Sequence, residues 1–248
     1  MAKPRRSNRH PAYRRVVLKI SGESFARPGE SGIDPAELAV IASEIADAAT
    51  PGDGVELAVV VGGGNIIRGA TLAERGQIHQ SIADYMGMLG TVINGIALRE
   101  TLAALGKDVR LMSAIDIPAV AEPFIRAKAL RHFEHGRILI LAAGTGNPFF
   151  TTDTCAALRA TELGAEVVLK ATKVDGVYSA DPKKNPKAER FEKITFAEAV
   201  SRKLGVMDLT ALTMCMERDL PVVVFDFKTK GNIRRVIRGE AVGTLVTN

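Results

Sequence analysis

Short apolar runs rich in β-branched residues recur along the chain and alternate with segments of helical periodicity. The six runs are Val16–Ile20, Leu57–Val61, Val109–Met112, Ile138–Leu141, Val167–Leu169 and Val222–Phe225. Strands that alternate with helices predict an α/β fold, in which helices cover both faces of a mainly parallel central sheet. Ligands bind such sheets outside the carboxyl ends of the strands, so we expect the chemistry in the segment that follows each run.

Two of the helical segments carry informative signals. Asp34, Pro35 and Glu37 predict an N-cap, a first-turn proline and a capping-box acid. A long helix is predicted from about Ser81 to Leu105, although each of its three internal glycines costs ~1 kcal/mol relative to alanine. Close packing against another element or another subunit would explain these glycines.

The basic residues are concentrated at the start of the chain. The 248 residues include 33 Lys and Arg against 28 Asp and Glu, and residues 1–15 hold six of the basic residues and none of the acidic ones. The rest of the chain is therefore close to neutral, which predicts no general affinity for nucleic acid. Residues 1–12 lack periodicity and are predicted to form a disordered basic arm, with residues 13–248 as a single domain.

Neither a membrane span nor a secretory signal is expected. No run approaches the ~20 apolar residues that a span needs, and Lys19 interrupts the first apolar run after three residues. A cytoplasmic location is the expectation. Cys155 and Cys215 lie in apolar surroundings 60 residues apart, where we expect buried free thiols.

Several of the segments that follow the apolar runs combine glycine or hydroxyl residues with a nearby cation. The segments are Lys19–Glu23, Gly62–Asn65 with Arg68 just beyond, Gly144–Asn147, Lys170–Lys173 and Asp226–Lys230. Glycine lets backbone N–H groups approach an oxyanion, and a cation neutralises its charge. Their convergence on one sheet edge predicts a polyphosphate site. The P-loop and dinucleotide fingerprints are both absent from the sequence, which excludes those two classes.

The segment Gly144–Asp153 is the most informative, because it contains two aromatic residues and a helix start. Phe149 and Phe150 can stack on a base, although it is equally expected that one of them fills the core beneath the loop. The last three residues open a helix, where N-capping is the ordinary role and phosphate binding the functional one. Asp153 is a candidate to organise Mg²⁺ or Lys19.

Two further patterns leave alternatives open. Val174–Tyr178 places Asp-Gly between β-prone residues, which predicts a hairpin that covers a nucleoside or is an ordinary surface turn. His132 and His135 flank Glu134 and are possible metal ligands. A solvated helix end is favoured for them, because no further cluster of ligands supports a metal site.

Several of these segments together resemble the amino acid kinase family, in its branch that phosphorylates UMP. The matching segments are Lys19–Glu23, Gly62–Asn65 with Arg68, Thr145–Asp153, Thr172–Pro182, Val206–Asp208 and Gly243–Leu245. The resemblance covers about residues 13–247. It implies a three-layer α/β/α sandwich that transfers the γ-phosphoryl group of ATP to UMP. The alternatives are another phosphotransferase of the family, or a regulator that responds to UMP or UTP and uses its basic arm on nucleic acid.

The resemblance also implies which residues act on each substrate. ATP would be held by Lys19, Ile20, Ser21, Gly22, Gly64, Arg68, Thr172, Tyr178 and Asp181. UMP would be held by Gly63, Asp84, Thr145, Gly146, Asn147, Pro148, Phe149, Phe150, Thr151 and Thr152. The expected catalytic residues are Lys19, Arg68 and Asp153. Mg²⁺ is expected on the ATP phosphates with few protein ligands, GTP and UTP as effectors, and a homohexamer as the assembly.

Overall fold

The computed structural model describes residues 11–50, 52–68, 76, 78–180, 182, 184–185 and 187–248, so residues 1–10 of the predicted basic arm lie outside it. The described strands form one nine-stranded sheet in the order β4-β3-β5-β2-β1-β6-β8-β9-β7. They are β1 (Arg15–Ile20), β2 (Glu56–Val61), β3 (Val109–Ser113), β4 (Glu122–Pro123), β5 (Ile138–Ala142), β6 (Val167–Thr172), β7 (Lys193–Thr195), β8 (Val222–Asp226) and β9 (Thr244–Thr247). All pairs are parallel except β8 with β9, which confirms the predicted mainly parallel sheet.

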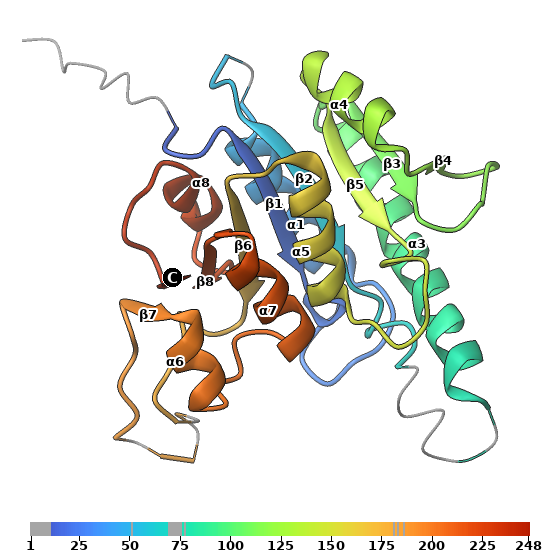
Figure 1. The fold of residues 1–248 in the computed structure, drawn as a ribbon. Coiled ribbons are helices and arrows are strands. Elements are labelled where there is room, and N and C mark those ends of the chain that lie inside the picture. The colour runs from blue at the N-terminus through green and yellow to red at the C-terminus, as the bar shows by residue number, and fades with distance from the viewer. Residues whose placement is uncertain are drawn as a thin grey trace, which may run out of the picture.

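Helices cover both faces of this sheet (Figure 1). On one face lie α1 (Pro35–Ala48), α3 (Gln80–Ala104) and α8 (Asn232–Ile237). On the other face lie α4 (Arg126–Glu134), α5 (Thr152–Leu163), α6 (Phe196–Ser201) and α7 (Leu209–Glu217). Because side chains alternate along a strand, Leu18 and Ile20 of β1 enter the first core and Val17 enters the second. The three-layer α/β/α sandwich is confirmed, while the division of the chain into a single domain stays a prediction.

Close packing explains two of the three internal glycines of α3, Gly90 and Gly95. A Cβ on Gly95 would lie 2.8 Å from Cδ1 of Leu111 in β3, and a Cβ on Gly90 would lie 3.2 Å from the carbonyl oxygen of Gly63. By length and composition α3 is apolar enough to cross a membrane. Its buried residues pack in the first core, however, as those of a core helix do.

The N-terminus of α1 confirms half of the predicted capping box. The Asp34 carboxylate accepts hydrogen bonds from the N–H groups of Ala36 and Glu37, at 2.9 and 3.0 Å. The backbone N–H of Asp34 donates a hydrogen bond to the Phe25 carbonyl and not to the side chain of Glu37. The Glu37 carboxylate instead forms an ion pair with Lys228 at 3.3 Å. A tertiary contact has therefore replaced the local one.

The hairpin predicted at Val174–Tyr178 is wrong. Tyr178 pairs with Arg190 in an isolated antiparallel bridge, twelve residues further on. Gly176 is required by a close approach to β9, because a Cβ there would lie 2.5 Å from Oγ1 of Thr244. The same hydroxyl accepts a hydrogen bond from the N–H of Val177 at 2.9 Å. The glycine of the Asp-Gly pair thus lets this segment pack closely against β9, and it does not form a tight turn.

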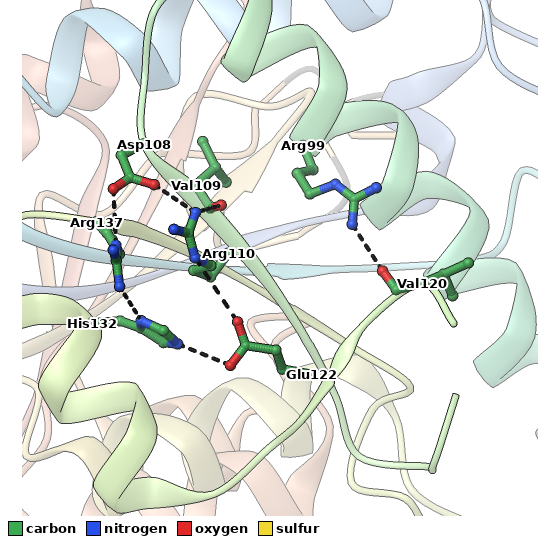
Figure 2. A network of polar contacts seen from close by, with 8 residues as sticks. All are labelled: Arg99, Asp108, Val109, Arg110, Val120, Glu122, His132 and Arg137. Carbon is green, nitrogen blue, oxygen red and sulfur yellow. Dashed lines mark hydrogen bonds and ion pairs between the residues drawn. The ribbon is translucent and has the colours of Figure 1, made fainter. Parts of the chain in front are cut away.

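His132 belongs to a polar network that joins α4 to the start of β5 and to β4 (Figure 2). Its Nε2 lies 3.1 Å from Glu122, and its Nδ1 lies 3.1 Å from Arg137, which also donates to Asp108 at 2.9 Å. Arginine only donates, so Nδ1 accepts and Nε2 carries the proton. The solvated position predicted for His132 is wrong, since its side chain is 11% exposed. His135 is exposed, as predicted.

Candidate active site

The segments after β1, β2, β5, β6 and β8 lie at one edge of the sheet, because these strands run parallel. In Figure 1 the arrowheads of β1, β2 and β5 point toward the lower side of the view. The glycine-rich and cationic segments of the sequence therefore converge where the parallel fold places its ligands.

Two lysines lie side by side on adjacent strands in the middle of the sheet. Lys19 of β1 and Lys170 of β6 are register partners on adjacent parallel strands. Asp153, in the first turn of α5, contacts both: its Oδ1 lies 2.8 Å from Lys19 Nζ, and its Oδ2 accepts a hydrogen bond from Lys170 Nζ at 2.7 Å. We call these three residues the lysine–aspartate cluster. With all three ionised, it carries one positive charge in excess.

The cluster is largely buried, which makes its charges strongly coupled. Burial by itself would raise the pKa of Asp153, but the charges of Lys19 and Lys170 outweigh burial and hold the pKa below its usual range. Burial lowers the pKa of Lys170, against the opposing charge of Asp153. No described residue donates a hydrogen bond in good geometry to Asp153 Oδ1, so its contact with Lys19 is described as an ion pair. An anion is the natural further partner for the excess positive charge.

Glycine backbones pack against one another beside the cluster. A Cβ on Gly22 would lie 2.5 Å from the backbone nitrogen of Gly64, and a Cβ on Gly62 would lie 2.5 Å from that of Gly22. No other residue type fits at these two positions without a shift of the backbone. The turns after β1 and β2 are thereby held together, and backbone N–H groups lie close to each other at the sheet edge.

A buried pair of asparagines, which the sequence analysis did not identify, supports the turn after β2. The two amides of Asn65 and Asn94 exchange hydrogen bonds at 2.6 and 3.0 Å, and Asn94 also donates to the carbonyl of Gly62 at 2.8 Å. Asn94 is fully buried in α3. The only signal in the sequence is a polar residue inside an otherwise apolar helical stripe.

Arg68 lies at the rim and does not join the lysine–aspartate cluster. Its guanidinium pairs with the carboxylate of Glu23, directly after β1, and the side chain is 60% exposed. Lys173 donates to the backbone carbonyl of the same Glu23 at 3.1 Å. Two cations are therefore tied to one residue at the mouth of the site. Neither Glu23 nor Lys173 was identified as a site residue from the sequence.

A pocket of about 310 Å³ lies between α3 and the segment after β5. Of the residues expected to hold UMP, it is lined by Gly63, Asp84, Thr145, Asn147, Phe150, Thr151 and Thr152. Gly87 of α3 also lines it and has no atom within 4 Å of its would-be Cβ, so its missing side chain leaves room for a ligand. We call this the acceptor pocket.

Three of the residues expected to hold UMP, Gly146, Pro148 and Phe149, do not line the acceptor pocket. Gly146 packs on Ala114, where a Cβ would lie 2.9 Å from a carbonyl oxygen. Phe149 is 70% exposed and Phe150 is 51% exposed, so neither fills the core beneath the loop. The expectation that one of them is a core residue is wrong. Pro148 and Phe149 themselves form a turn.

A second pocket of about 380 Å³ adjoins the cluster at Lys170, and we call it the nucleoside pocket because two of the residues expected to contact the nucleoside of ATP line it. Among its lining residues are Thr172, Tyr178 and Lys170. Thr172 donates to the carbonyl of Val174 at 2.6 Å. Tyr178 donates to Asp175 at 2.6 Å, and this bond raises the pKa of the phenol. Asp181, also expected to contact ATP, lies outside the described residues.

Asp208 links the two sides of the site. Its carboxylate caps α7 and accepts hydrogen bonds from the hydroxyls of Thr151, at 2.5 Å, and Thr154, at 3.0 Å. Lys170 donates to the carbonyl of Val206, two residues before Asp208, at 2.5 Å. The start of α5 is thus fixed relative to both Asp153 and Lys170. Lys170 was expected in one of the cationic segments that follow the strands, but neither Lys170 nor Asp208 was among the residues expected to hold ATP or UMP.

Comparison with known proteins shows which family has this architecture. The model of the amino acid kinase family matches residues 14–226, and the chain belongs to that family. It is 53% identical over 234 residues to a protein named Uridylate kinase PUMPKIN, chloroplastic, from Arabidopsis thaliana, with 94% of this chain and 68% of that protein covered.

Solved structures agree with this relationship. The chain resembles the crystal structure of UMP kinase from Bacillus anthracis with a TM-score of 0.90 and 40% identity, covering 95% of this chain and 96% of that one. It resembles UMP kinase from Ureaplasma parvum with a TM-score of 0.88 and 36% identity, covering 95% and 99%.

Proposed function

We propose that the chain transfers the γ-phosphoryl group of ATP to UMP, giving ADP and UDP. One observation carries the proposal: the lysine–aspartate cluster adjoins two pockets. Lys170 itself lines the nucleoside pocket, and Thr152, the neighbour of Asp153, lines the acceptor pocket. A buried positive charge beside two cavities suits a phosphoryl group in transit between two nucleotides. The names of the relatives support UMP as the acceptor.

The proposed reaction needs positioning and charge neutralisation more than covalent chemistry. A phosphate oxygen of UMP attacks the γ-phosphorus of ATP. As the new O–P bond forms, the bond between the γ-phosphorus and the bridging oxygen breaks, and its electrons leave with ADP. The excess positive charge of the cluster stabilises the transferred oxygens. The phosphate of UMP is already anionic near neutral pH, so no strong general base is required.

Mg²⁺ is part of the proposal as an ion carried by ATP. Within the described residues, no three His, Cys, Asp or Glu side chains form a group that could hold a metal. Asp153 is engaged by two lysines, which makes it a poor ligand for a cation. The donor set therefore suits an ion bound through phosphate oxygens, where it would neutralise charge on the β- and γ-phosphates. Lys19 and Lys170 would hold the phosphates and not the ion.

Acceptor choice is tested by ADP release in a coupled assay, with UMP, CMP, dTMP, glutamate and carbamate offered in parallel. We expect turnover with UMP to exceed that with every other acceptor. Strong turnover with another acceptor and little with UMP would identify a different phosphotransferase of the family. Binding of UMP without any turnover would favour the nucleotide-responsive regulator.

Asp84→Ala is expected to raise KM for UMP about tenfold and to leave KM for ATP within twofold. Asp84 lines the acceptor pocket and not the nucleoside pocket, and hydrogen bonds to a carboxylate contribute about 1.5–3 kcal/mol. Initial rates with one substrate varied at saturating concentrations of the other give both constants. Equal changes in the two KM values would contradict a role on the acceptor side.

The proposed homohexamer is supported by an apolar stripe on α3. Ile82, Tyr85, Leu89 and Ile93 recur at helical spacing and are 41–55% exposed, although they are large and hydrophobic. Such a stripe is typical of a helix that packs on a partner. A second copy of the chain would cover it in one of the contacts of the assembly.

Leu89→Arg is therefore expected to reduce the molar mass of the particle in solution, because a charge would be buried in the contact. Light scattering after size-exclusion chromatography measures this mass. Leu105→Arg is the matched control, since Leu105 is 50% exposed but lies beyond the end of α3. An unchanged assembly for Leu89→Arg would place the subunit contact elsewhere. We also propose that GTP activates and UTP inhibits the enzyme. Adding each nucleotide to the coupled assay tests these effects. A cytoplasmic location is part of the same proposal.

A further inference from the structure

We propose that Gln80 is a positioning residue for the acceptor site, which acts through Asp84 on the segment after β5. This inference rests on the proposed function, because UMP is taken as the ligand of the acceptor pocket. The hydrogen bonds that Gln80 and Asp84 make support this role, and no sequence motif indicates it. Gln80 is half-buried at the first position of α3.

A chain of two hydrogen bonds leads from Gln80 to the loop. Its Nε2 donates to Oδ1 of Asp84, one helical turn later, at 2.7 Å. The other carboxylate oxygen, Oδ2, accepts from the backbone N–H of Phe149 at 2.8 Å. Asp84 and Phe149, 65 positions apart in the sequence, are thus joined by a hydrogen bond. This bond lies beside the acceptor pocket, whose lining includes Asp84 from α3 and Phe150 from the loop.

The loop needs this restraint at Phe149. The φ angle of Phe149 is 72°, in the left-handed region that costs a bulky residue roughly 1 kcal/mol or more. Its side chain is 70% exposed, so burial of the ring does not hold the backbone in place. The hydrogen bond to Asp84 offsets this cost, and it does so only while the carboxylate keeps its orientation.

The carboxylate can serve both the loop and a ligand. A carboxylate has about four acceptor positions, two on each oxygen. Gln80 and Phe149 occupy one position on each oxygen of Asp84, and no other described residue donates to this carboxylate, so one position on each oxygen is available within the described part of the chain. Two adjacent acceptors match the two neighbouring hydroxyls of a ribose. Gln80 fixes the plane of the carboxylate, so that the loop contact and the ribose contacts are satisfied together.

Gln80→Leu removes the amide donor with little change in size. We expect KM for UMP to rise about fivefold, with kcat and KM for ATP within twofold, which is the scale of one hydrogen bond. The control is His79→Ala, which removes the side-chain cap of the same helix end but keeps the Gln80 amide. Its KM for UMP should stay within twofold. An unchanged KM in Gln80→Leu, or an equal rise in both variants, would overturn the proposal.

Gln80→Glu adds a pH signature that simple loss of helix stability does not produce. At high pH the new carboxylate repels Asp84, whereas its protonated form donates a hydrogen bond and restores the contact. The ratio of KM for UMP between this variant and the wild type should therefore fall as the pH decreases from about 7 toward the ordinary range of a glutamate carboxyl, at about 5 to 4.5. A ratio that is constant over this range would contradict the proposed contact.

Hydrogen exchange provides a readout that does not depend on turnover. The amide of Phe149 should exchange several times faster in Gln80→Leu than in the wild type, and at the wild-type rate in His79→Ala. Equal exchange in Gln80→Leu and the wild type overturns the role of Gln80. Turnover of UMP by the wild type tests the proposed function separately, so failure of one is not mistaken for failure of the other.

Discussion

Lys19→Ala is expected to lower kcat at least ~100-fold, the scale seen when one charge-stabilising donor is removed from a site of this kind. The variant takes away the excess positive charge of the lysine–aspartate cluster. Asp153 keeps Lys170 as its partner at 2.7 Å, so a neutral ion pair remains and the protein should still fold. The measurement is ADP release at saturating ATP and UMP, with a thermal unfolding curve to confirm the fold.

Lys128→Ala provides the comparison for that experiment. Lys128 is exposed on α4, on the surface and away from the cluster, and its removal should leave kcat within twofold. If Lys19→Ala folds normally and retains kcat within threefold, Lys19 is a structural residue and the proposed charge stabilisation is wrong.

Asp153→Asn should damage the fold as well as the reaction. The substitution leaves Lys19 and Lys170 as register partners on adjacent strands with no counter-charge between them. Breaking a buried ion pair in this way costs about 3–5 kcal/mol, which corresponds to a decrease of roughly 10 °C in Tm for a chain of this size. Calorimetry measures the shift. Asp53→Asn, at an ion pair with Arg234 that is about one-third exposed, should change Tm by no more than ~2 °C.

The same carboxyl group predicts a pH dependence of stability. The pKa of Asp153 is lower in the folded protein than in the unfolded chain. Its ion pairs therefore contribute fully above the unfolded value of ~3.9, and the contribution is lost as the pH falls through the folded-state pKa. The wild type should lose stability in acid below about pH 4, and Asp153→Asn should lose less over that range. Parallel losses would show that other carboxyl groups control the acid transition.

The strands and the long helix were predictable because their signals are local. All six apolar runs are strands in the structure, and α3 spans Gln80–Ala104 where the pattern predicted about Ser81 to Leu105. Burial on both faces of a parallel sheet produces continuous apolar runs whatever the neighbours are. Gly90 and Gly95 of α3 required the fold to explain them, since their packing partners Gly63 and Leu111 lie outside the helix.

Two of the errors share a physical cause, which is that a tertiary contact replaced a local one. Gly176 looked like a turn residue but allows close packing against Thr244. His132 looked like part of a solvated helix end, yet it lies between Glu122 and Arg137. A local pattern states what a residue tends to do alone. It contains no information about a partner that is distant in the sequence.

The amino-acid sequence by itself determined the alternation of strands and helices, the sheet edge where chemistry is found, and the segments that gather there. Periodicity and turn chemistry are properties of neighbouring residues, so they can be recognised in a single chain. Only the tertiary structure decided that Lys170 faces Lys19 and shares Asp153 with it, and that Gln80 and Asp84 hold Phe149. Strand register and helix docking set those distances, and both are outcomes of packing over the whole molecule.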